Sequence, residues 1–380
     1  MSNISFISNF FGAFFRKQKP EKATEELQQN IHHSKCRLGS IRLRWVILLL
    51  LFVFVRVIMS NDELGEWYSR SFYPRLSVPL SYFSAFFPFS LGDCFIYGSI
   101  LGLLFYFLYV CIKRRNKKKA LICILEFLGW VYVWFYLAWG LNYFRQSFFV
   151  RMQIHPVTYS KKEFHSFLSV YTDSLNASSI GAKPVDSFLI ESEIKKGYSL
   201  IYKRFGLNKP EPYLHPKSML VAPLMSKVGV LGYMGPFFIE YNLNPDLLPV
   251  QYPFTYAHEL AHVLGIANEA EANLYGFLVC SQSMIPHIRF SAHLALLPYV
   301  IGNAHQLLSK EEFGLWVKTI SPQVKDIYNQ KTEYWESLYS PLIGDIQDRL
   351  YSFFLKSNNI PTGQKNYSEV IALLMSLRES

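Results

Sequence analysis

The stretch TYAHELAHVLGIANEAEANLY, residues 255–275, contains two histidines four positions apart, with a glutamate directly after the first. On an α-helix, residues i and i+4 share one face with their β-carbons about 5–6 Å apart, so His258 and His262 can bind one tetrahedral metal ion. Glu259 lies one residue round from His258, where its carboxylate can reach a water molecule without binding the metal. The pattern therefore predicts a helix that holds one Zn²⁺ ion and a catalytic base, Glu259.

A zinc ion in such a site needs a third protein ligand, and two glutamates follow the helix. Gly265 can end the first helix, and Asn268 can begin a second helix by forming a capping box with Glu271. Glu269 is then free, and it points about 200° away from Glu271 on the helix, so the two cannot bind one ion. We expect Glu269 to be the third ligand, with Glu271 as the alternative. Asn273, four residues after Glu269, is expected to orient a ligand through a hydrogen bond.

Three apolar runs precede this stretch, at residues 45–59, 94–112 and 120–141. A helix needs about 20 apolar residues to cross the hydrocarbon layer, a length that the second and third runs reach and the first nearly reaches. The chain is 51% hydrophobic and only 17% charged, which is apolar for a soluble enzyme. The runs therefore predict a three-helix transmembrane region over residues 45–142, with the lipid bilayer as its partner.

The formal net charge of +10 is concentrated in the N-terminal part of the chain. Residues 1–142 carry 17 Lys and Arg against 8 Asp and Glu, whereas residues 143–380 carry 21 against 20. A basic excess beside apolar runs is typical of membrane topology signals and not of a surface that binds phosphates. Nucleic acid is therefore not expected as a partner.

The same charges predict an orientation in the membrane. By the positive-inside rule, the basic tail at residues 1–44 and the basic loop at residues 113–119 are cytoplasmic. Three crossings then place residues 143–380 outside the cytoplasm. No small-residue cleavage site follows the first apolar run, so we expect the first helix to remain as an uncleaved anchor.

Residues 143–380 are expected to form one α+β domain, mostly helical with a small sheet. Apolar spacing predicts helices at 161–175 and 191–205, and a glycine-rich stretch of β-forming residues at 226–244 predicts strands joined by turns. After residue 269, helices are expected to the end of the chain. Breaks between them are expected near Pro286, Pro298, Pro322, Pro341 and Pro361. This order of elements is typical of a small zincin-like metallopeptidase domain.

In zincin-like folds, the strand before the metal-binding helix is an exposed edge that can pair with an extended peptide. The candidate for this edge is GPFFIEYN, residues 235–242. An ordinary core strand is an equal alternative for the same residues.

The stretch PFTYAHELAHVLGIANEAEANLYGFLVC, residues 253–280, resembles the core of the domain-of-unknown-function 3810 family, bacterial membrane proteins of the zincin type. The segments FPFSLGDCFIY (87–97), WGLNYFRQ (139–146) and LYSFFLKSNNIPTGQKNYSEVIALL (350–374) resemble patterns of that family too. The resemblance implies a membrane-anchored metallopeptidase fold, but no substrate, because the family is uncharacterised. More loosely, ExxAN at 269–273 resembles peptidases whose first glutamate there is the third zinc ligand, some with aspartate at the last position.

The leading hypothesis is therefore a zinc-dependent metallopeptidase of a bacterial inner membrane that hydrolyses peptide bonds in the periplasm. His258, His262 and Glu269 would bind the zinc ion, and Glu259 would pass a proton from water to the leaving amine. Two alternatives remain open: a non-proteolytic membrane scaffold on a zincin fold, and a metal-dependent amidase that acts on a cell-envelope component. The presence of Glu259 favours an enzyme, because a structural site needs no base.

Overall fold

The computed structural model of the protein describes residues 43–157 and 159–378, which are mostly helical with a small sheet. Residues 1–42 of the predicted basic tail (residues 1–44) lie outside the described part. The chain divides into two compact units, Met1–Phe54 and Val55–Ser380. The second unit contains the last two predicted spans together with the predicted zincin-like domain, and the division into tail, spans and domain stays a prediction.

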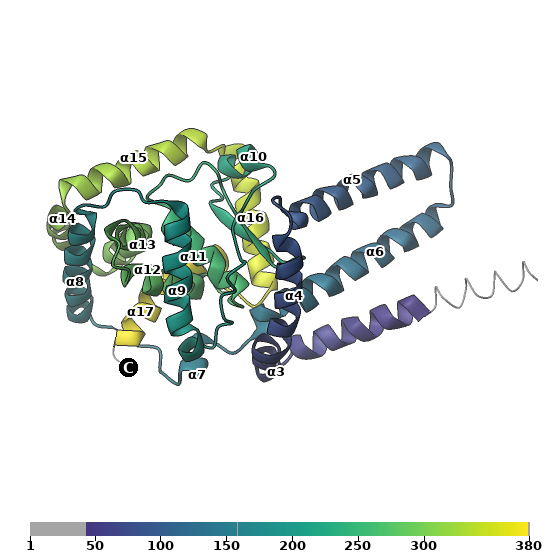
Figure 1. Ribbon diagram of the computed structural model, residues 1–380, viewed down its shortest axis with the longest axis horizontal. Helices are drawn as coiled ribbons and strands as arrows, with labels where there is room; N and C mark the ends of the chain where they lie inside the picture. Colours follow the sequence, from purple (N-terminus) through teal and green to yellow (C-terminus); the bar gives the residue numbers. More distant parts are fainter. Residues whose placement is uncertain (1–42, 158, 379–380) are drawn as a thin grey trace, which may run out of the picture. The chain divides into compact units, whose positions relative to one another are not determined.

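Two helices of the described residues are long and apolar enough to cross a membrane, α5 (Leu91–Ile112) and α6 (Lys117–Ala138). They lie side by side, joined by a short loop, and we call residues 91–138 the hairpin (Figure 1). A third crossing is possible if the helix Leu43–Met59 and the segment Asp62–Ala85, bent by 107° at the break between them, form one broken span. The membrane-helix character expected from the sequence is therefore confirmed.

The polypeptide after the hairpin, residues 140–378, forms what we call the body. The predicted helices at 161–175 and 191–205 are present as α8 (Lys161–Ser179) and α9 (Ser187–Phe205). The other helical elements of the described second unit are α3 (Asp62–Trp67), η1 (Tyr68–Phe72), α4 (Tyr73–Ala85), η2 (Gly140–Phe144), α7 (Phe148–Met152), α10 (Ala222–Lys227), α11 (Tyr252–Val263), α12 (Glu269–Ser281), α13 (Pro286–Leu307), α14 (Lys310–Thr319), α15 (Pro322–Leu338), α16 (Pro341–Ser357), η3 (Gly363–Glu369) and α17 (Val370–Arg378).

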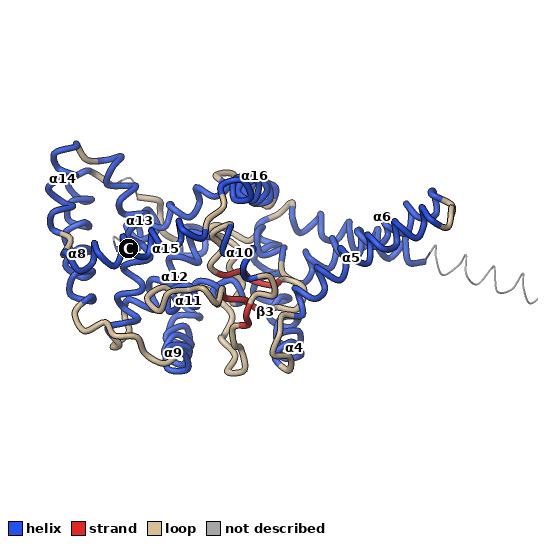
Figure 2. Tube along the Cα trace, turned by 90° about the horizontal axis from the view of Figure 1, so that it is seen from above, coloured by secondary structure: helices blue, strands red, loops and turns tan. Residues whose placement is uncertain are grey.

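The sheet has the strand order β1-β3-β2. The central strand β3 (Glu240–Leu243) is buried; it pairs in parallel with β1 (Lys217–Ser218) and antiparallel with β2 (Gly232–Gly235). The candidate edge strand, residues 235–242, is therefore not one strand: it contains the end of β2, a turn and the start of β3. The edge of the sheet next to α11 is β2. Figure 2 shows the strands between α4 and α16, near the start of α5.

The expected break at Pro298 is wrong, because this proline lies inside α13. A proline within a helix removes one backbone hydrogen bond, which favours a kink or an end. Here the helix continues because it is held by tertiary packing: Leu294, Leu297 and Val300 around the proline are buried in the core. Packing of this kind outweighs local propensity in most protein helices.

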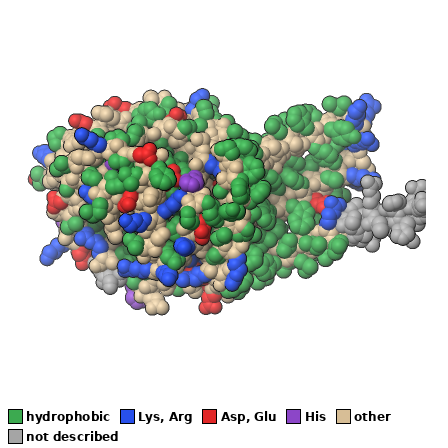
Figure 3. Space-filling view, in the orientation of Figure 1, with side chains coloured by type: hydrophobic (Ala, Val, Ile, Leu, Met, Phe, Trp, Pro, Cys, Tyr) green, Lys and Arg blue, Asp and Glu red, His purple; other side chains and the backbone are tan. Residues whose placement is uncertain are grey.

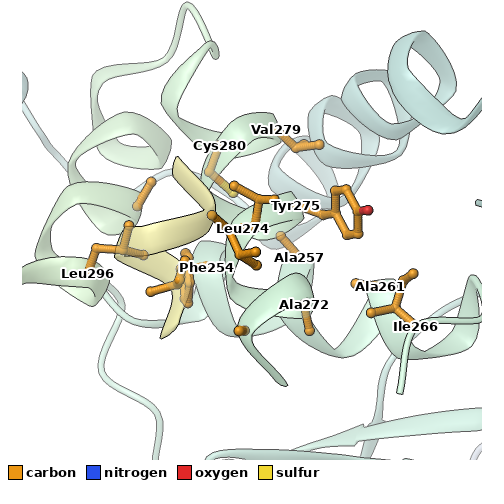
Figure 4. Close-up of a cluster of buried hydrophobic side chains, with 14 of the residues drawn as sticks. Phe254, Ala257, Ala261, Ile266, Ala272, Leu274, Tyr275, Val279, Cys280 and Leu296 are labelled. Carbon is orange, nitrogen blue, oxygen red and sulfur yellow. The ribbon is translucent and has the colours of Figure 1, made fainter. Parts of the chain in front are cut away.

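The core between α11 and α12 explains how close these two helices come (Figure 4). Ala257 and Ala261 on α11 and Ala272 on α12 are small, buried side chains. Gly276 of α12 lies against α11, since a β-carbon added there would stand 3.4 Å from the backbone nitrogen of His258. Small residues on both faces therefore bring the start of α12 beside the histidines.

Candidate metal centre

The turn between α11 and α12 aims Glu269 at the histidines. Gly265 has a φ of 97°, in the left-handed region that favours glycine, and the predicted helix end there is confirmed. The Asn268 side chain accepts a hydrogen bond of 3.0 Å from the backbone N–H of Glu271, which confirms Asn268 as the N-terminal cap of α12. The chain thus folds back so that the first residue of α12, Glu269, faces α11.

Three potential ligand atoms from His258, His262 and Glu269 lie close together in the buried space between α11 and α12. The two histidine Nε2 atoms are 3.1 Å apart, and Oε2 of Glu269 is 3.2 and 3.3 Å from them. Zinc bonds of about 2.0–2.1 Å in a tetrahedron imply ligand-to-ligand distances of about 3.3–3.4 Å. The spacing and the chemistry of this cluster therefore fit one tetrahedral Zn²⁺ ion.

The charges in the cluster favour a cation as well. Burial alone would lower the pKa of His262, but the negative charge of Glu269 and its hydrogen bond raise that pKa to about 9. Burial raises the pKa of Glu269, yet the charge of His262 and the hydrogen bonds from both histidines more than offset this, and the pKa lies well below its usual range. The buried carboxylate of Glu269 is thus stabilised by a positive charge beside it. A protonated histidine or a bound metal ion supplies such a charge.

The histidine rings are held in place by groups outside the cluster. Nδ1 of His262 lies 2.6 Å from the carbonyl oxygen of Ile266, so it acts as the donor, and Nε2 is the ring nitrogen that faces the cluster. The ring of His258 stacks on that of Tyr367, with centroids 6.2 Å apart and planes at 13°. The ring of His262 is thus held by a hydrogen bond and the ring of His258 by stacking, while Nδ1 of His258 has no hydrogen-bond partner among the described residues.

The carboxylate of Glu269 is positioned by two elements far along the chain. The hydroxyl of Tyr351, on α16, donates a hydrogen bond of 2.6 Å to Oε1 of Glu269. Burial raises the pKa of Tyr351 well above its usual value, so the hydroxyl stays a neutral donor. Oδ1 of Asn366, in η3, accepts from the backbone N–H groups of Glu269 and Ala270 at 3.0 and 3.2 Å. No local pattern points to Tyr351 or Asn366, although both lie in the segment 350–374 that resembles the family.

Glu259 lies beside the cluster but is not a member of it. Its carboxylate is buried, and Oε2 has no hydrogen-bond partner among the described residues. Burial raises the pKa of Glu259, and the nearby His258 and His262 offset this in part. Oε1 of Glu259 packs closely against β2: a β-carbon added at Gly232 would lie 2.5 Å from this oxygen. A carboxylate with an unpartnered oxygen next to a candidate metal site is placed as a general base needs to be.

The alternative ligand, Glu271, is directed away from the cluster. Its carboxylate forms a buried ion pair with Arg151 of α7 and accepts a hydrogen bond of 3.3 Å from the Tyr275 hydroxyl. The predicted capping box is therefore incomplete, because Asn268 caps the backbone of Glu271 while the Glu271 side chain binds Arg151 instead of returning to Asn268. Glu271 contributes to packing and not to the cluster.

Asn273 lies near the cluster with partners that differ from those expected. Its Nδ2 donates a weak hydrogen bond of 3.4 Å to the backbone carbonyl of Tyr367, and its side chain also interacts with the Tyr299 hydroxyl. In the part of the chain that the structure describes, these are its partners, and neither is His258, His262 or Glu269. Asn273 therefore supports Tyr367, the residue that stacks on His258.

A cavity of about 1060 Å³ lies against the cluster. His258 and Glu259 form part of its floor, and β2, α13 and α16 contribute to its walls. The walls are largely apolar, and their polar side chains include Tyr299, Lys331, Asp348, Tyr351, Gln364 and Tyr367. Largely apolar cavities with a few convergent polar groups are typical of sites that bind organic ligands. Glu259 thus borders this cavity.

Comparison with known protein families identifies one match. A family model described as "Protein of unknown function (DUF3810)" matches residues 68–375. The matched region begins in η1, ends in α17 and includes the hairpin, the cluster and the cavity. No curated protein and no solved structure matches the chain.

Proposed function

We propose that this chain, which belongs to the DUF3810 family of proteins of unknown function, is a membrane-anchored zinc metallopeptidase. One observation carries the proposal: three ligand atoms at tetrahedral spacing lie next to the unpartnered carboxylate of Glu259. A purely structural metal site is closed and has no use for such a base. The large cavity over Glu259 adds room for a substrate.

In the proposed reaction, His258, His262 and Glu269 hold the metal. A Zn²⁺ ion bound by these side chains would supply a Lewis acid that lowers the pKa of water to about 7 and polarises a peptide carbonyl. Glu259 takes the proton from the attacking water on its free Oε2 and delivers it to the amide nitrogen that leaves. Tyr351 keeps Glu269 in position through its hydrogen bond.

We also propose that the body has a zincin-like fold. Two features support this: the histidine-bearing α11 is followed by α12, which carries the third acidic residue, and an antiparallel pair of strands lies beside α11. The edge strand β2 lines the cavity next to Glu259, where its unpaired backbone groups can bind an extended peptide. This arrangement favours a peptide over other amides as the substrate.

The proposed location is the inner membrane of a bacterium, with the body on the periplasmic side. The loop at the tip of the hairpin carries six basic residues between positions 113 and 119, which the positive-inside rule assigns to the cytoplasm. Figure 3 shows these Lys and Arg side chains at the end of the hairpin that is remote from the body. The body would then lie on the opposite side of the membrane.

The experiment that tests the proposed function is cleavage of a randomised peptide mixture by the purified, zinc-supplemented protein in detergent. New amino termini should appear with the wild-type protein and fall by about 100- to 10,000-fold in Glu259→Gln, because this change removes the general base and keeps the size of the side chain. Hydrolysis of cell-envelope amides but not of peptides would replace the peptidase with an amidase. Zinc binding without any hydrolysis would favour a scaffold.

A further inference from the structure

A stripe of apolar side chains on α16 is exposed at the surface. Leu342, Ile346, Leu350 and Phe353 are 78%, 56%, 65% and 71% exposed. Their spacing of three and four residues places them on one face of the helix. Contiguous apolar surface of this kind marks a place where a protein contacts another apolar body.

A second exposed apolar face belongs to α4 and the residues that follow it. Val78, Tyr82 and Phe86 follow one another at intervals of four, and Phe83 and Phe89 are exposed beside them. Helices that lie in the membrane interface bury Phe, Trp and Leu on their apolar face, and Tyr is enriched where the membrane meets water. The composition of this face is therefore typical of the membrane interface.

Both helices lie where the hairpin joins the body. Figures 1 and 2 show α4 and α16 running crosswise to α5 and α6, on either side of the base of the hairpin. The end of α16 contacts the end of α6: the rings of Phe354 and Phe135 are 6.0 Å apart, and the Tyr136 hydroxyl donates to Oδ1 of Asn358 at 2.9 Å. Helices that run crosswise to a membrane span are parallel to the plane of the membrane.

The apolar surface of the hairpin continues onto this side of the body. In Figure 3, hydrophobic side chains extend without a break from the hairpin over the adjoining face of the body, while charged side chains are more frequent elsewhere on the body. We infer that α4 and α16 dock on the lipid bilayer that the hairpin crosses, so that the cavity opens at the membrane surface. The lipid bilayer is the partner because its apolar layer already surrounds the surface with which the stripe is continuous.

The rim of the cavity is part of the same stripe. Ile343, Ile346 and Leu350 of α16 line the cavity and are also exposed, and exposed Leu224 lines it from α10. The cluster itself is close to the end of the span: Nε1 of Trp139, the first residue after α6, donates a hydrogen bond of 3.0 Å to the backbone carbonyl of His262. A molecule that enters through this rim therefore comes from the membrane surface.

This location specifies the substrate class, an inference that rests on the proposed peptidase function. A polypeptide anchored in the membrane, by a lipid or by a transmembrane helix, brings its adjoining segment to the rim of the cavity. A free peptide has to reach the same place from solution. The anchor also raises the concentration of substrate at the rim, since anchored molecules are confined to the bilayer.

The docking is tested on the full chain in vesicles of phosphatidylethanolamine and phosphatidylglycerol with brominated acyl chains. The parent protein has serine in place of Cys36, Cys94, Cys111 and Cys123. In this parent, one cysteine at a time replaces Leu342, Phe353 or Phe86. Each cysteine is labelled with a fluorophore that bromine quenches. Phe188→Cys and Leu200→Cys on α9 are matched controls, because these side chains are 73% and 79% exposed but lie on another helix. Labels at 342, 353 and 86 should be quenched and those at 188 and 200 should not. Equal, weak quenching at all five positions would overturn the docking.

The substrate class is tested in the same vesicles without bromine. The zinc-loaded wild-type protein receives one randomised peptide mixture, either free or palmitoylated at its amino terminus. The palmitoylated form should be cleaved about tenfold faster or more. Equal rates would overturn the inference about the substrate. Failure to cleave either form, together with quenching of the labels on α16 in the brominated vesicles, would reject the peptidase function and leave the docking intact.

Discussion

Two glutamates that stand two residues apart, Glu269 and Glu271, have different surroundings. Glu269 faces two histidine nitrogens, whereas Glu271 faces Arg151 on the opposite side of α12. The reason is the helix itself, since residues two apart point about 200° away from each other. Their roles are therefore separable by substitution.

Glu271→Ala should destabilise the protein without loss of the metal. The Glu271 and Arg151 side chains are only 7% and 1% exposed, so the change leaves an unpaired buried guanidinium. Breaking a buried pair in this way costs about 3–5 kcal/mol of unfolding free energy. Thermal unfolding in detergent should show a lower midpoint, and elemental analysis should show undiminished zinc in the folded fraction. Zinc loss with an unchanged midpoint would instead make Glu271 a ligand.

Tyr351→Phe should weaken metal binding and leave the fold intact. The change removes the hydrogen bond to Oε1 of Glu269 and keeps the aromatic ring. Loss of a residue that orients a metal ligand typically reduces affinity by about 10–100-fold. Competition with a zinc chelator measures this, with Tyr334→Phe as the control, because the Tyr334 hydroxyl donates to the backbone of Asp246 on another part of the body. Equal affinities in the two variants would count against the role of Tyr351.

At the scale of elements, the sequence predicted those helices whose signals are local. The apolar spacing of α8 and α9, and the glycine after α11, depend on neighbours within a few positions. Two features were not predicted because they depend on packing and strand pairing. Pro298 lies inside a helix because of tertiary packing, and the turn inside residues 235–242 is set by the pairing of β2 with β3.

The same distinction applies to the candidate site. Helix geometry alone was sufficient to expect His258 and His262 together, because they are four residues apart. Glu269 was expected beside them from the local signals for a helix end at Gly265 and a new helix at Asn268, with Glu271 left as the alternative. Tyr351 and Asn366 are 82 and 97 residues away from Glu269, and only the folding of α16 and η3 brings them close. A tyrosine or an asparagine at such a separation leaves no pattern in the sequence.

The sheet and the hairpin are joined by a buried polar network around Glu240 of β3. Oε1 of Glu240 accepts a hydrogen bond of 2.8 Å from the Ser90 hydroxyl, which caps α5, and Oε2 pairs with Lys217 of β1 at 2.6 Å. The Lys217 and Glu240 side chains are 7% and 1% exposed. This network fixes the start of α5 against the sheet that carries the cavity wall.

Glu240→Ala should therefore destabilise the body by about 3–5 kcal/mol, because it leaves the Lys217 ammonium buried and unpaired. The proposed metal ligands are not part of this network, so zinc binding should be unchanged. Glu193→Ala is the control: Glu193 pairs loosely with exposed Lys196 at 3.9 Å, and such surface changes usually stay within about 0.5 kcal/mol. Unfolding in urea compares the two variants. Equal stability would show that the network is not needed.

At the scale of the whole molecule, the proposed topology predicts which residues face which side of the membrane. In a parent protein with the exposed cysteines replaced, Leu200→Cys on the body should react with a membrane-impermeant thiol reagent applied to bacterial spheroplasts. Asn116→Cys in the loop of the hairpin should react only after the membrane is opened, since the basic loop is expected inside. The reverse pattern of labelling would place the body in the cytoplasm.

The proposed peptidase function depends on whether His258, His262 and Glu269 bind a metal. Elemental mass spectrometry of the purified full-length protein, after exposure to zinc and removal of the excess, measures this directly. We predict close to one zinc per chain in the wild-type protein and in Glu259→Gln, and loss of zinc in Glu269→Ala. A well-folded wild-type protein that retains no zinc, or a Glu269→Ala variant that retains all of it, would contradict the proposed metal centre.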